Sequence, residues 1–282
     1  MKKLLVRTIA AVALSASLAT PALAHRQWML PSATTFSGDD VWVTVDAAVS
    51  NDLFYFEHRP LRLDNVKAWA PDGSEVPLEH QSTAQYRSTF DVHLVQKGTY
   101  RIGSANDMLM GSYVLNGKTE RLPRGTTKET LAKAIPAGAT NVQTSESTNR
   151  NELYVTVGEP TAAIFKPASK GIELVPVTHP NDLVAGEAAT FQFLLDGKPA
   201  ADLPVTVIPG GIRYRDQLNQ MDLKTGADGK VSITWPAAGM YWVNVTTPRP
   251  ARGNAEEGKA SAPTAMPARR ASYVTTLEVM AP

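Results

Sequence analysis

The chain has 282 residues, with 28 basic and 27 acidic side chains and no cysteine. Without cysteine the chain can form neither a disulfide nor a lipidated N-terminus, so its stability has to come from buried side chains. The near balance of charge argues against nucleic acid, or an anionic membrane surface, as the main partner.

The N-terminus has the pattern of a secretory signal. Lys2, Lys3 and Arg7 are basic, residues 8–20 are mostly apolar or small, and residues 22–24 (Ala-Leu-Ala) supply a small–x–small cleavage site. We therefore predict a signal peptide at 1–24 and a mature protein in the periplasm. The apolar run is too short to anchor the chain, and no later segment reaches about 18 uninterrupted apolar residues, so we expect no membrane span.

Beyond residue 25 the sequence predicts β-structure almost throughout. Apolar and polar side chains alternate over several short segments, as in half-buried strands. The turn dipeptides Asp72-Gly73, Asn116-Gly117, Asp196-Gly197 and Asp228-Gly229 lie among them and suit tight hairpins. The pattern predicts an all-β fold of antiparallel sandwiches. The predicted strands are 41–47, 90–95, 152–158, 190–195, 230–235 and 272–280.

One segment has a helical pattern. Thr126 and Glu129 have capping-box spacing, Leu131 and Ile135 are four apart, and Pro136 follows. We predict one short helix here, inside a long polar excursion that covers residues 111–150.

Two breaks in the strand pattern organise the chain. The first, at 158–171, predicts a boundary between an N-terminal β-sandwich domain at 25–165 and a C-terminal immunoglobulin-like β-sandwich domain at 170–282. The second, at 247–271, is rich in proline, alanine and charge. Because that composition buries little apolar surface, we predict a loop before the last strand.

His25 is the first candidate for chemistry. Cleavage after Ala24 would make it the mature N-terminus, where its α-amine and imidazole could chelate one metal ion. A further imidazole would complete a T-shaped histidine brace, which suits copper(II). Cleavage after Ala22 would instead place His25 third, which is also a square-planar site for copper or nickel. The alternative is that His25 simply follows the cut.

Four other histidines could supply the second imidazole. His58 is favoured because Glu57 and a group of aromatic residues precede it, although it could equally be a packing residue. His93 lies on the strand face opposite its apolar neighbours, so it is either a ligand or a solvent-facing side chain. His80 and His179 lie in turn-like sequence and carry no such indication. The predicted metal ligands are therefore His25, His58 and His93.

No catalytic motif is present. The chain lacks a Gly-x-Ser-x-Gly elbow, a His-Glu-x-x-His helix and any cysteine for a Cys-His pair. We expect no catalytic residues and a protein that is not an enzyme.

Several motifs resemble an uncharacterised periplasmic family labelled as a NikM-like periplasmic component of cobalt or nickel transport. They are "AHRQWMLPS" with His25, Trp28, Leu30 and Pro31, then "VQKGTYRIG", "DGKPAADLPVTVIPGG" and "TGADGKVSITWPAAGMYWVNV". The resemblance implies a metal-uptake context. The cofactor would be a transition metal ion (copper, or nickel or cobalt), and the partner an inner-membrane transporter or an outer-membrane receptor.

Two functions follow as hypotheses. The first is a periplasmic accessory protein that binds nickel, cobalt, copper or iron for uptake, through His25 with His58 or His93. The second is a non-catalytic exported β-sandwich that binds a protein partner, in which the histidines are incidental. A third, oxidation at a copper-loaded histidine brace, would need an exposed aromatic strip, and the sequence shows none.

Overall fold

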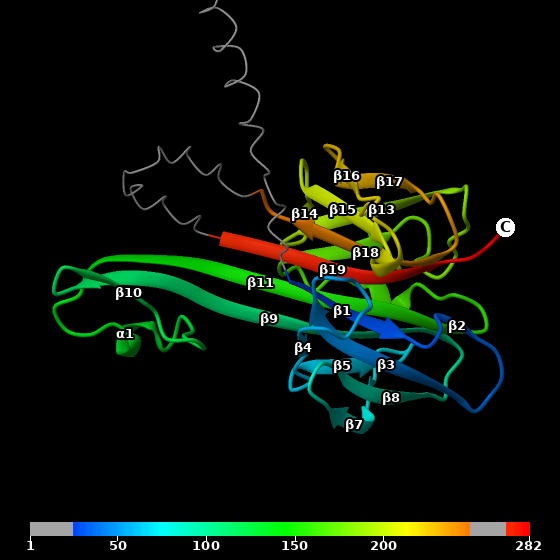
Figure 1. Ribbon diagram of the computed structural model, residues 1–282, viewed down its shortest axis with the longest axis horizontal. Coiled ribbons are helices and arrows are strands. Elements are labelled where there is room, and N and C mark those ends of the chain that lie inside the picture. The colour runs from blue at the N-terminus through cyan, green and yellow to red at the C-terminus, as the bar shows by residue number, and fades with distance from the viewer. Residues whose placement is uncertain (1–24, 249–268) are drawn as a thin grey trace, which may run out of the picture.

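A computed structural model describes residues 25–248 and 269–282 (Figure 1). The predicted signal peptide at 1–24 lies outside the described residues, as does all of the predicted loop at 247–271 except its ends. No helix in the described part is long and apolar enough to span a membrane.

Three sheets form the fold, which is all-β as predicted. The first outer sheet follows the order β1 (Arg26–Pro31), β3 (Val41–Ser50), β8 (Ser88–Leu94) and β7 (Glu79–Thr83), with β4 (Arg59–Pro60) beside β3. The second outer sheet follows the order β12 (Ile172–Pro176), β13 (Ala188–Leu195) and β14 (Lys198–Pro199), with β17 (Lys230–Thr234) beside β13.

A ten-stranded central sheet lies between the two outer sheets (Figure 1). Its order is β16 (Met221–Lys224), β15 (Pro204–Pro209), β18 (Gly239–Thr246), β19 (Arg269–Val279), β11 (Thr140–Val157), β9 (Gly98–Leu115), β5 (Val66–Trp69) and β6 (Glu75–Val76). β10 (Lys118–Arg121) pairs with β9, and β2 (Thr35–Phe36) pairs with β11.

The alternating pattern identified the apolar faces of the outer strands correctly. Val41, Val43 and Val45 of β3 are buried, as are Phe90 and Val92 of β8. They belong to one core, which lies between the first outer sheet and the central sheet. The apolar residues of β13 and β17 belong to a second core on the other side; they are Phe191, Phe193, Val231 and Ile233.

β11 departs from the prediction of a half-buried strand. Leu153 and Val155 enter the first core, whereas Tyr154 between them enters the second core. The strand is buried on both faces because an outer sheet covers each side of the central sheet. An alternating apolar pattern indicates only one covered face, so the sequence could not show the second.

The two cores share the central sheet through a parallel pair of strands. β11 and β19 run parallel from Glu146 opposite Arg269 to Leu153 opposite Thr276. Strands from both sides of the predicted domain boundary therefore belong to one sheet. Near that boundary the short 3₁₀ helix η1 (Ala163–Phe165) contributes Ile164 and Phe165 to the second core. The division into domains at 165–170 stays a prediction.

A third apolar cluster joins the first outer sheet to the C-terminal half. Trp28 and Leu53 pack there with Ile208 and Trp242, all of them buried. The Trp242 indole Nε1 also donates to the carbonyl of Gln27 at 3.0 Å. The start of β1 is therefore fixed against strands that follow it by more than 170 residues in the chain.

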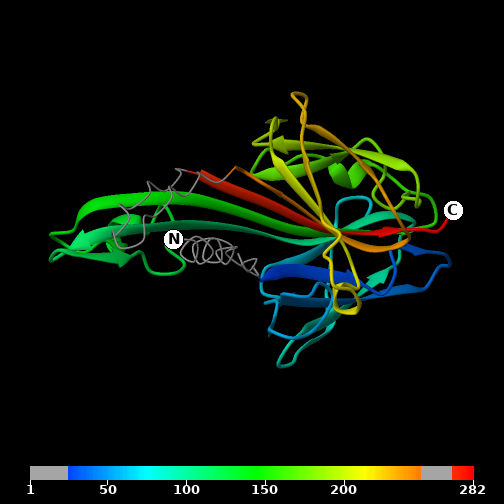
Figure 2. The ribbon, with the colours of Figure 1, turned by 45° about the horizontal axis from the view of Figure 1, so that its top comes forward.

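The far ends of β9 and β11 form an arm that protrudes from the body (Figures 1 and 2). Asn116 and Gly117 make its hairpin turn, with φ of 51° and 75°. The predicted helix is present as α1 (Leu131–Ala134), but the expected capping box is not formed. Thr126 instead donates its hydroxyl to the Pro123 carbonyl, and Thr130 occupies the N-cap position of α1 without a side-chain capping hydrogen bond.

Candidate functional site

The structure brings together two of the three predicted metal ligands. The imidazole rings of His25 and His58 stack with their centroids 3.8 Å apart and their planes 13° from parallel. Both residues are exposed to solvent. We call these two side chains the histidine pair.

The strands next to the two histidines explain how they meet. β1 and β4 pair with the same end of β3, where Ala48 lies opposite both Trp28 and Pro60. β1 and β4 therefore flank β3 on its two edges. Because His25 directly precedes β1 and His58 directly precedes β4, both side chains lie at the end of β3.

Hydrogen bonds fix the strand that follows His25. Arg26 donates from Nη1 to the Asn51 carbonyl at 2.8 Å. Trp28 is fully buried, and its indole Nε1 donates to Ser50 Oγ at 2.7 Å. These contacts tie β1 to the last residues of β3, so the position of His25 is set by its neighbours in the strand.

The loop of residues 51–58 fixes His58. Phe54 and Phe56 pack against the Trp28 ring at centroid distances of 5.5 and 5.6 Å. The Glu57 carboxylate accepts the backbone N–H groups of Asn51 and Asp52 at 2.7 and 2.9 Å. The loop is thus held at both ends, and His58 follows directly after its last fixed residue.

Among the described residues, no third His, Asp or Glu side chain is placed to complete a metal site with the histidine pair. In residues 25–248 and 269–282 no group of three or more His, Asp or Glu side chains is placed to hold a metal ion. Glu57 is already engaged with two backbone N–H groups. A complete site at this position would therefore need a backbone nitrogen, a free α-amine or water as its further ligands.

The ring geometry shows what metal binding would require. Imidazole lone pairs lie in the ring plane, so two nearly parallel rings direct them side by side and not toward one point. Two nitrogens on opposite sides of one ion, each at about 2.0 Å, would be about 4 Å apart, whereas the 3.8 Å between the two histidines is a stacking distance between ring centroids. Binding one ion through both rings would therefore require at least one of these exposed side chains to turn out of the stacked arrangement.

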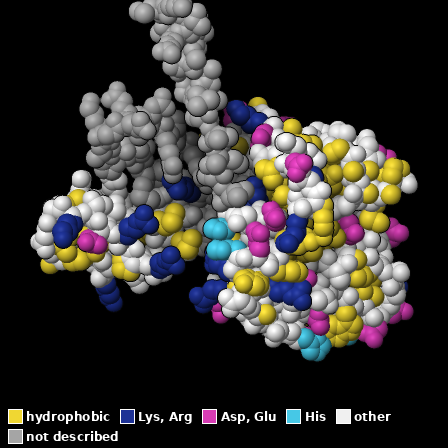
Figure 3. All heavy atoms as spheres, viewed as in Figure 1, with side chains coloured by type: hydrophobic (Ala, Val, Ile, Leu, Met, Phe, Trp, Pro, Cys, Tyr) yellow, Lys and Arg dark blue, Asp and Glu magenta, His cyan; other side chains and the backbone are white. Residues whose placement is uncertain are grey.

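His93, the third predicted ligand, lies elsewhere. It stacks on Trp42 at 4.2 Å, and its Nε2 is 2.7 Å from Asp40 Oδ1. Trp42 is directly opposite His93 and eight residues from Ser50 along β3, which corresponds to about 26 Å. The structure does not bring His93 to the histidine pair, and Figure 3 shows histidine side chains at two separate places on the face it presents.

His80 has a polar partner that the sequence did not indicate. A bulge in the pairing of β7 with β8 and a left-handed backbone (φ 48°) place its Nδ1 2.8 Å from Asp91 Oδ2. The hydroxyl of Thr44, and then His80, lower the pKa of Asp91. A β-bulge redirects a single side chain, and no local sequence pattern predicts the bulge at His80.

His179 is part of a half-buried polar contact between elements. Its Nδ1 accepts the Asn181 N–H at 3.1 Å, so its Nε2 carries the proton and donates to Thr99 Oγ1 at 3.0 Å. Burial lowers its pKa. Because both ring nitrogens are hydrogen-bonded, His179 has a structural role and is not placed to coordinate a metal ion.

The protein has an all-β fold in which two sandwiches share a central sheet, and the histidine pair is exposed at the start of β1. The chain belongs to a family of proteins with a domain of unknown function, DUF4198, whose model matches residues 22–249. None of the curated proteins matches the chain.

The solved structures that the chain matches are distant. The D0-D1 domain of Intimin is 12% identical and has a TM-score of 0.23, with 89% of this chain and 97% of that chain covered. The D00-D0 domain of Intimin is 10% identical with a TM-score of 0.20, covering 90% and 100%. A marsupial T cell receptor is 11% identical with a TM-score of 0.20, covering 91% and 74%. Values this low support no conclusion about function.

Proposed function

We propose that this chain is a periplasmic accessory protein that binds a transition metal ion for metal uptake, with the histidine pair as its primary site. The observation that carries the proposal is the stacking of His25 on His58 at 3.8 Å. Two separate supports, β1 and the loop of residues 51–58, hold these exposed side chains together. Two exposed imidazoles that buried neighbours keep in contact are better placed to bind a ligand than to contribute to packing.

The chemistry of the donors favours copper(II) or nickel(II). Cleavage after Ala24 frees the α-amine of His25, which together with its own imidazole chelates one ion. The His58 imidazole is the third nitrogen, and three nitrogens in one plane suit the tetragonal preference of these ions. The protein binds the ion without transforming a substrate, and an inner-membrane transporter or outer-membrane receptor of an uptake system is its partner.

The test is a titration of copper(II) and nickel(II) into the exported, tag-free protein, followed by native mass spectrometry. We expect a mass that begins at His25 with one retained ion. His25→Ala should abolish tight binding, and His58→Ala should weaken it by at least tenfold. His93→Ala is the matched control, since it removes an imidazole outside the pair, and it should bind as the unmodified protein does.

A chemical modification tests the amine. Acetylation of the α-amine of the mature protein keeps both imidazoles but blocks the amine as a donor, so affinity for copper(II) should fall. If His25→Ala binds copper(II) and nickel(II) as tightly as the unmodified protein, the assignment of the metal site to the histidine pair is wrong. The interaction-module hypothesis, which the protruding arm of β9 and β11 favours, would then lead.

A further inference from the structure

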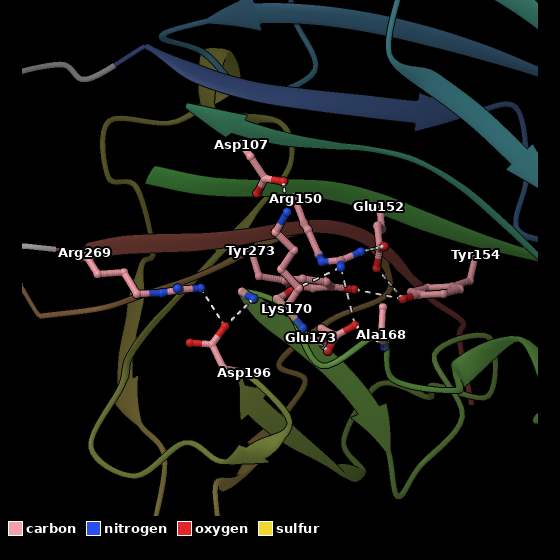
Figure 4. A network of polar contacts seen from close by, with 11 residues as sticks. Asp107, Arg150, Glu152, Tyr154, Ala168, Lys170, Glu173, Asp196, Arg269 and Tyr273 are labelled. Carbon is pink, nitrogen blue, oxygen red and sulfur yellow. Dashed lines mark hydrogen bonds and ion pairs between the residues drawn. The ribbon is translucent and has the colours of Figure 1, made fainter. Parts of the chain in front are cut away.

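A row of polar side chains runs along one face of β11 (Figure 4). Successive even-numbered residues share this face, which Tyr154 shows to be the side of the second outer sheet. Cross-strand partners extend the row: Asp107 lies opposite Thr148, Arg269 opposite Glu146 and Tyr273 opposite Arg150. The residues of β11 in the row are Glu146, Thr148, Arg150, Glu152 and Tyr154.

The inner end of the row is closed and internally paired. Arg150 lies 3.3 Å from Glu152 and 3.4 Å from Glu173, and all three side chains are nearly buried. The Tyr154 hydroxyl donates to the second Glu152 oxygen at 2.9 Å, and Glu173 accepts the Ala168 N–H at 2.7 Å. These groups satisfy one another, so this end stabilises the fold and leaves no room for a ligand.

The outer end of the row opens into a cavity of about 330 Å³ at the base of the arm. Its floor includes Asp107, Leu109, Glu146 and Arg269, and residues 127–129 and Lys170 form its sides. A volume near 300 Å³ is at the lower end of the range for small-molecule sites. The cavity lies on the face of the central sheet opposite the first outer sheet, so it is separate from the histidine pair.

The charges around the cavity are balanced. Lys128, Lys170 and Arg269 face Asp107, Glu129 and Glu146. Lys128 pairs with Glu146 at 2.7 Å, Lys170 pairs with Asp107, and Arg269 pairs with Asp196 at 2.6 Å. The contact between Arg269 Nη1 and Glu146 Oε2 is looser, at 3.9 Å, which is beyond hydrogen-bonding distance.

This balance selects against a ligand with a single charge. An anion at Arg269 would lie beside the Glu146 carboxylate, and a cation at Glu146 would lie beside the Arg269 guanidinium, so one of these two groups repels a ligand with a single charge. A ligand that carries both charges can bridge Arg269 Nη1 and Glu146 Oε2 while Arg269 Nη2 keeps its contact with Asp196 and Glu146 Oε1 keeps its contact with Lys128. The guanidinium is suited to a carboxylate, which can accept a charge-assisted hydrogen bond from Nη1.

We propose that this cavity binds a small zwitterion of the amino-acid class with an apolar side chain. Its carboxylate contacts Arg269, its ammonium group contacts Glu146, and its apolar part lies along Leu109 and Met108. The proposal does not depend on metal binding by the histidine pair.

A series of three matched probes tests the charge requirement on the unmodified protein by isothermal titration calorimetry. L-leucine carries both charges, leucinamide keeps only the ammonium group, and 4-methylpentanoate keeps only the carboxylate. We expect L-leucine to bind and each single-charge analogue to bind at least tenfold more weakly. No heat or spectral change with L-leucine, or equal affinity for the three probes, would overturn the proposal.

Variants then locate the site. Arg269→Gln and Glu146→Gln should each weaken L-leucine binding by at least tenfold, with folding checked by circular dichroism. Lys224→Gln removes an exposed ion pair with Asp202 outside the cavity and should bind as the unmodified protein does. His25→Ala should also bind L-leucine normally, so a failure of the metal proposal is distinguishable from a failure of this one. Unchanged affinity for L-leucine in both Arg269→Gln and Glu146→Gln would overturn the assignment of the site to this cavity. If these variants unfold, the probe series on the unmodified protein still tests the proposal.

Discussion

Phe54 shows how a single residue positions the histidine pair. Its backbone is left-handed (φ 63°), which is uncommon for a bulky side chain and costs of order 1–3 kcal/mol. This conformation lets its ring pack edge-on against the buried Trp28. It also needs Gly210 beneath it, because a Cβ there would lie 2.9 Å from the ring. The strain is offset by burial, and the loop that leads to His58 is held as a result.

His179 determines a pH dependence of stability. Burial lowers its pKa in the folded protein below the ordinary value of 6.5, so the unfolded chain binds more protons between these two values. The free energy of unfolding therefore rises with pH in that window, and stability is lost as the pH falls below about 6.5. In His179→Asn the side-chain oxygen can still accept the Asn181 N–H, but the new side chain does not titrate in this pH range.

Urea unfolding of both proteins at about pH 7.5 and about pH 5 measures this effect. We expect the unmodified protein to lose more stability between the two values than His179→Asn does. An identical loss in the two proteins would show that His179 stays unprotonated or is paired in the unfolded chain too.

At the scale of single elements, β11 depends on one buried cation. Arg150 compensates both Glu152 and Glu173, which lie on β11 and β12. Arg150→Met keeps much of the side-chain volume but removes the ion-pair partner of two nearly buried carboxylates. We expect this change to lower the free energy of unfolding by about 3–5 kcal/mol.

Chemical denaturation measures that loss, and an exposed ion pair provides its control. Lys67 and Glu75 are 2.8 Å apart, but both side chains are about half exposed. Lys67→Met should therefore change stability by less than about 1 kcal/mol. Equal effects of the two substitutions would mean that the Arg150 cluster is as well hydrated as the surface pair.

For the whole molecule, the shared central sheet predicts a single unfolding transition. Leu153 of β11 is buried in the first core and Phe191 of β13 in the second. Leu153→Ala should cost about 2–5 kcal/mol and Phe191→Ala about 3–5 kcal/mol. Because β11 and β19 connect the two cores, either substitution should shift the same transition in differential scanning calorimetry.

Two calorimetric peaks, of which each substitution shifts only one, would contradict this expectation. The two sandwiches would then unfold as independent domains, as the boundary predicted at 158–171 suggests. A conservative control is Val177→Ala, since Val177 is 62% exposed and should leave the transition almost unchanged.

Local sequence was sufficient for the six predicted strands and the four turn dipeptides, but it did not predict other strands of the central sheet such as β9, β15 and β18. The alternation in residues 41–47 and 190–195 reports one buried face directly, and the positive φ values at Asn116 and Asp196 are those that their turn dipeptides favour. His25 and His58 were also chosen from local features, the cleavage pattern and the aromatic cluster before His58. Their stacking, in contrast, depends on β3, which pairs with the strand after each of them.

The sequence by itself determined the fold class, the turns and which histidines were candidates, because side-chain periodicity and turn chemistry act over a few residues. Only the tertiary structure decided that β11 is buried on both faces, that His93 lies about 26 Å along β3 from the pair, and that a charged cavity forms at the base of the arm. Each of these depends on contacts between distant segments, such as Glu146 and Arg269, which are 123 residues apart. Such pairings are set by how the sheets pack together, and no local pattern records them.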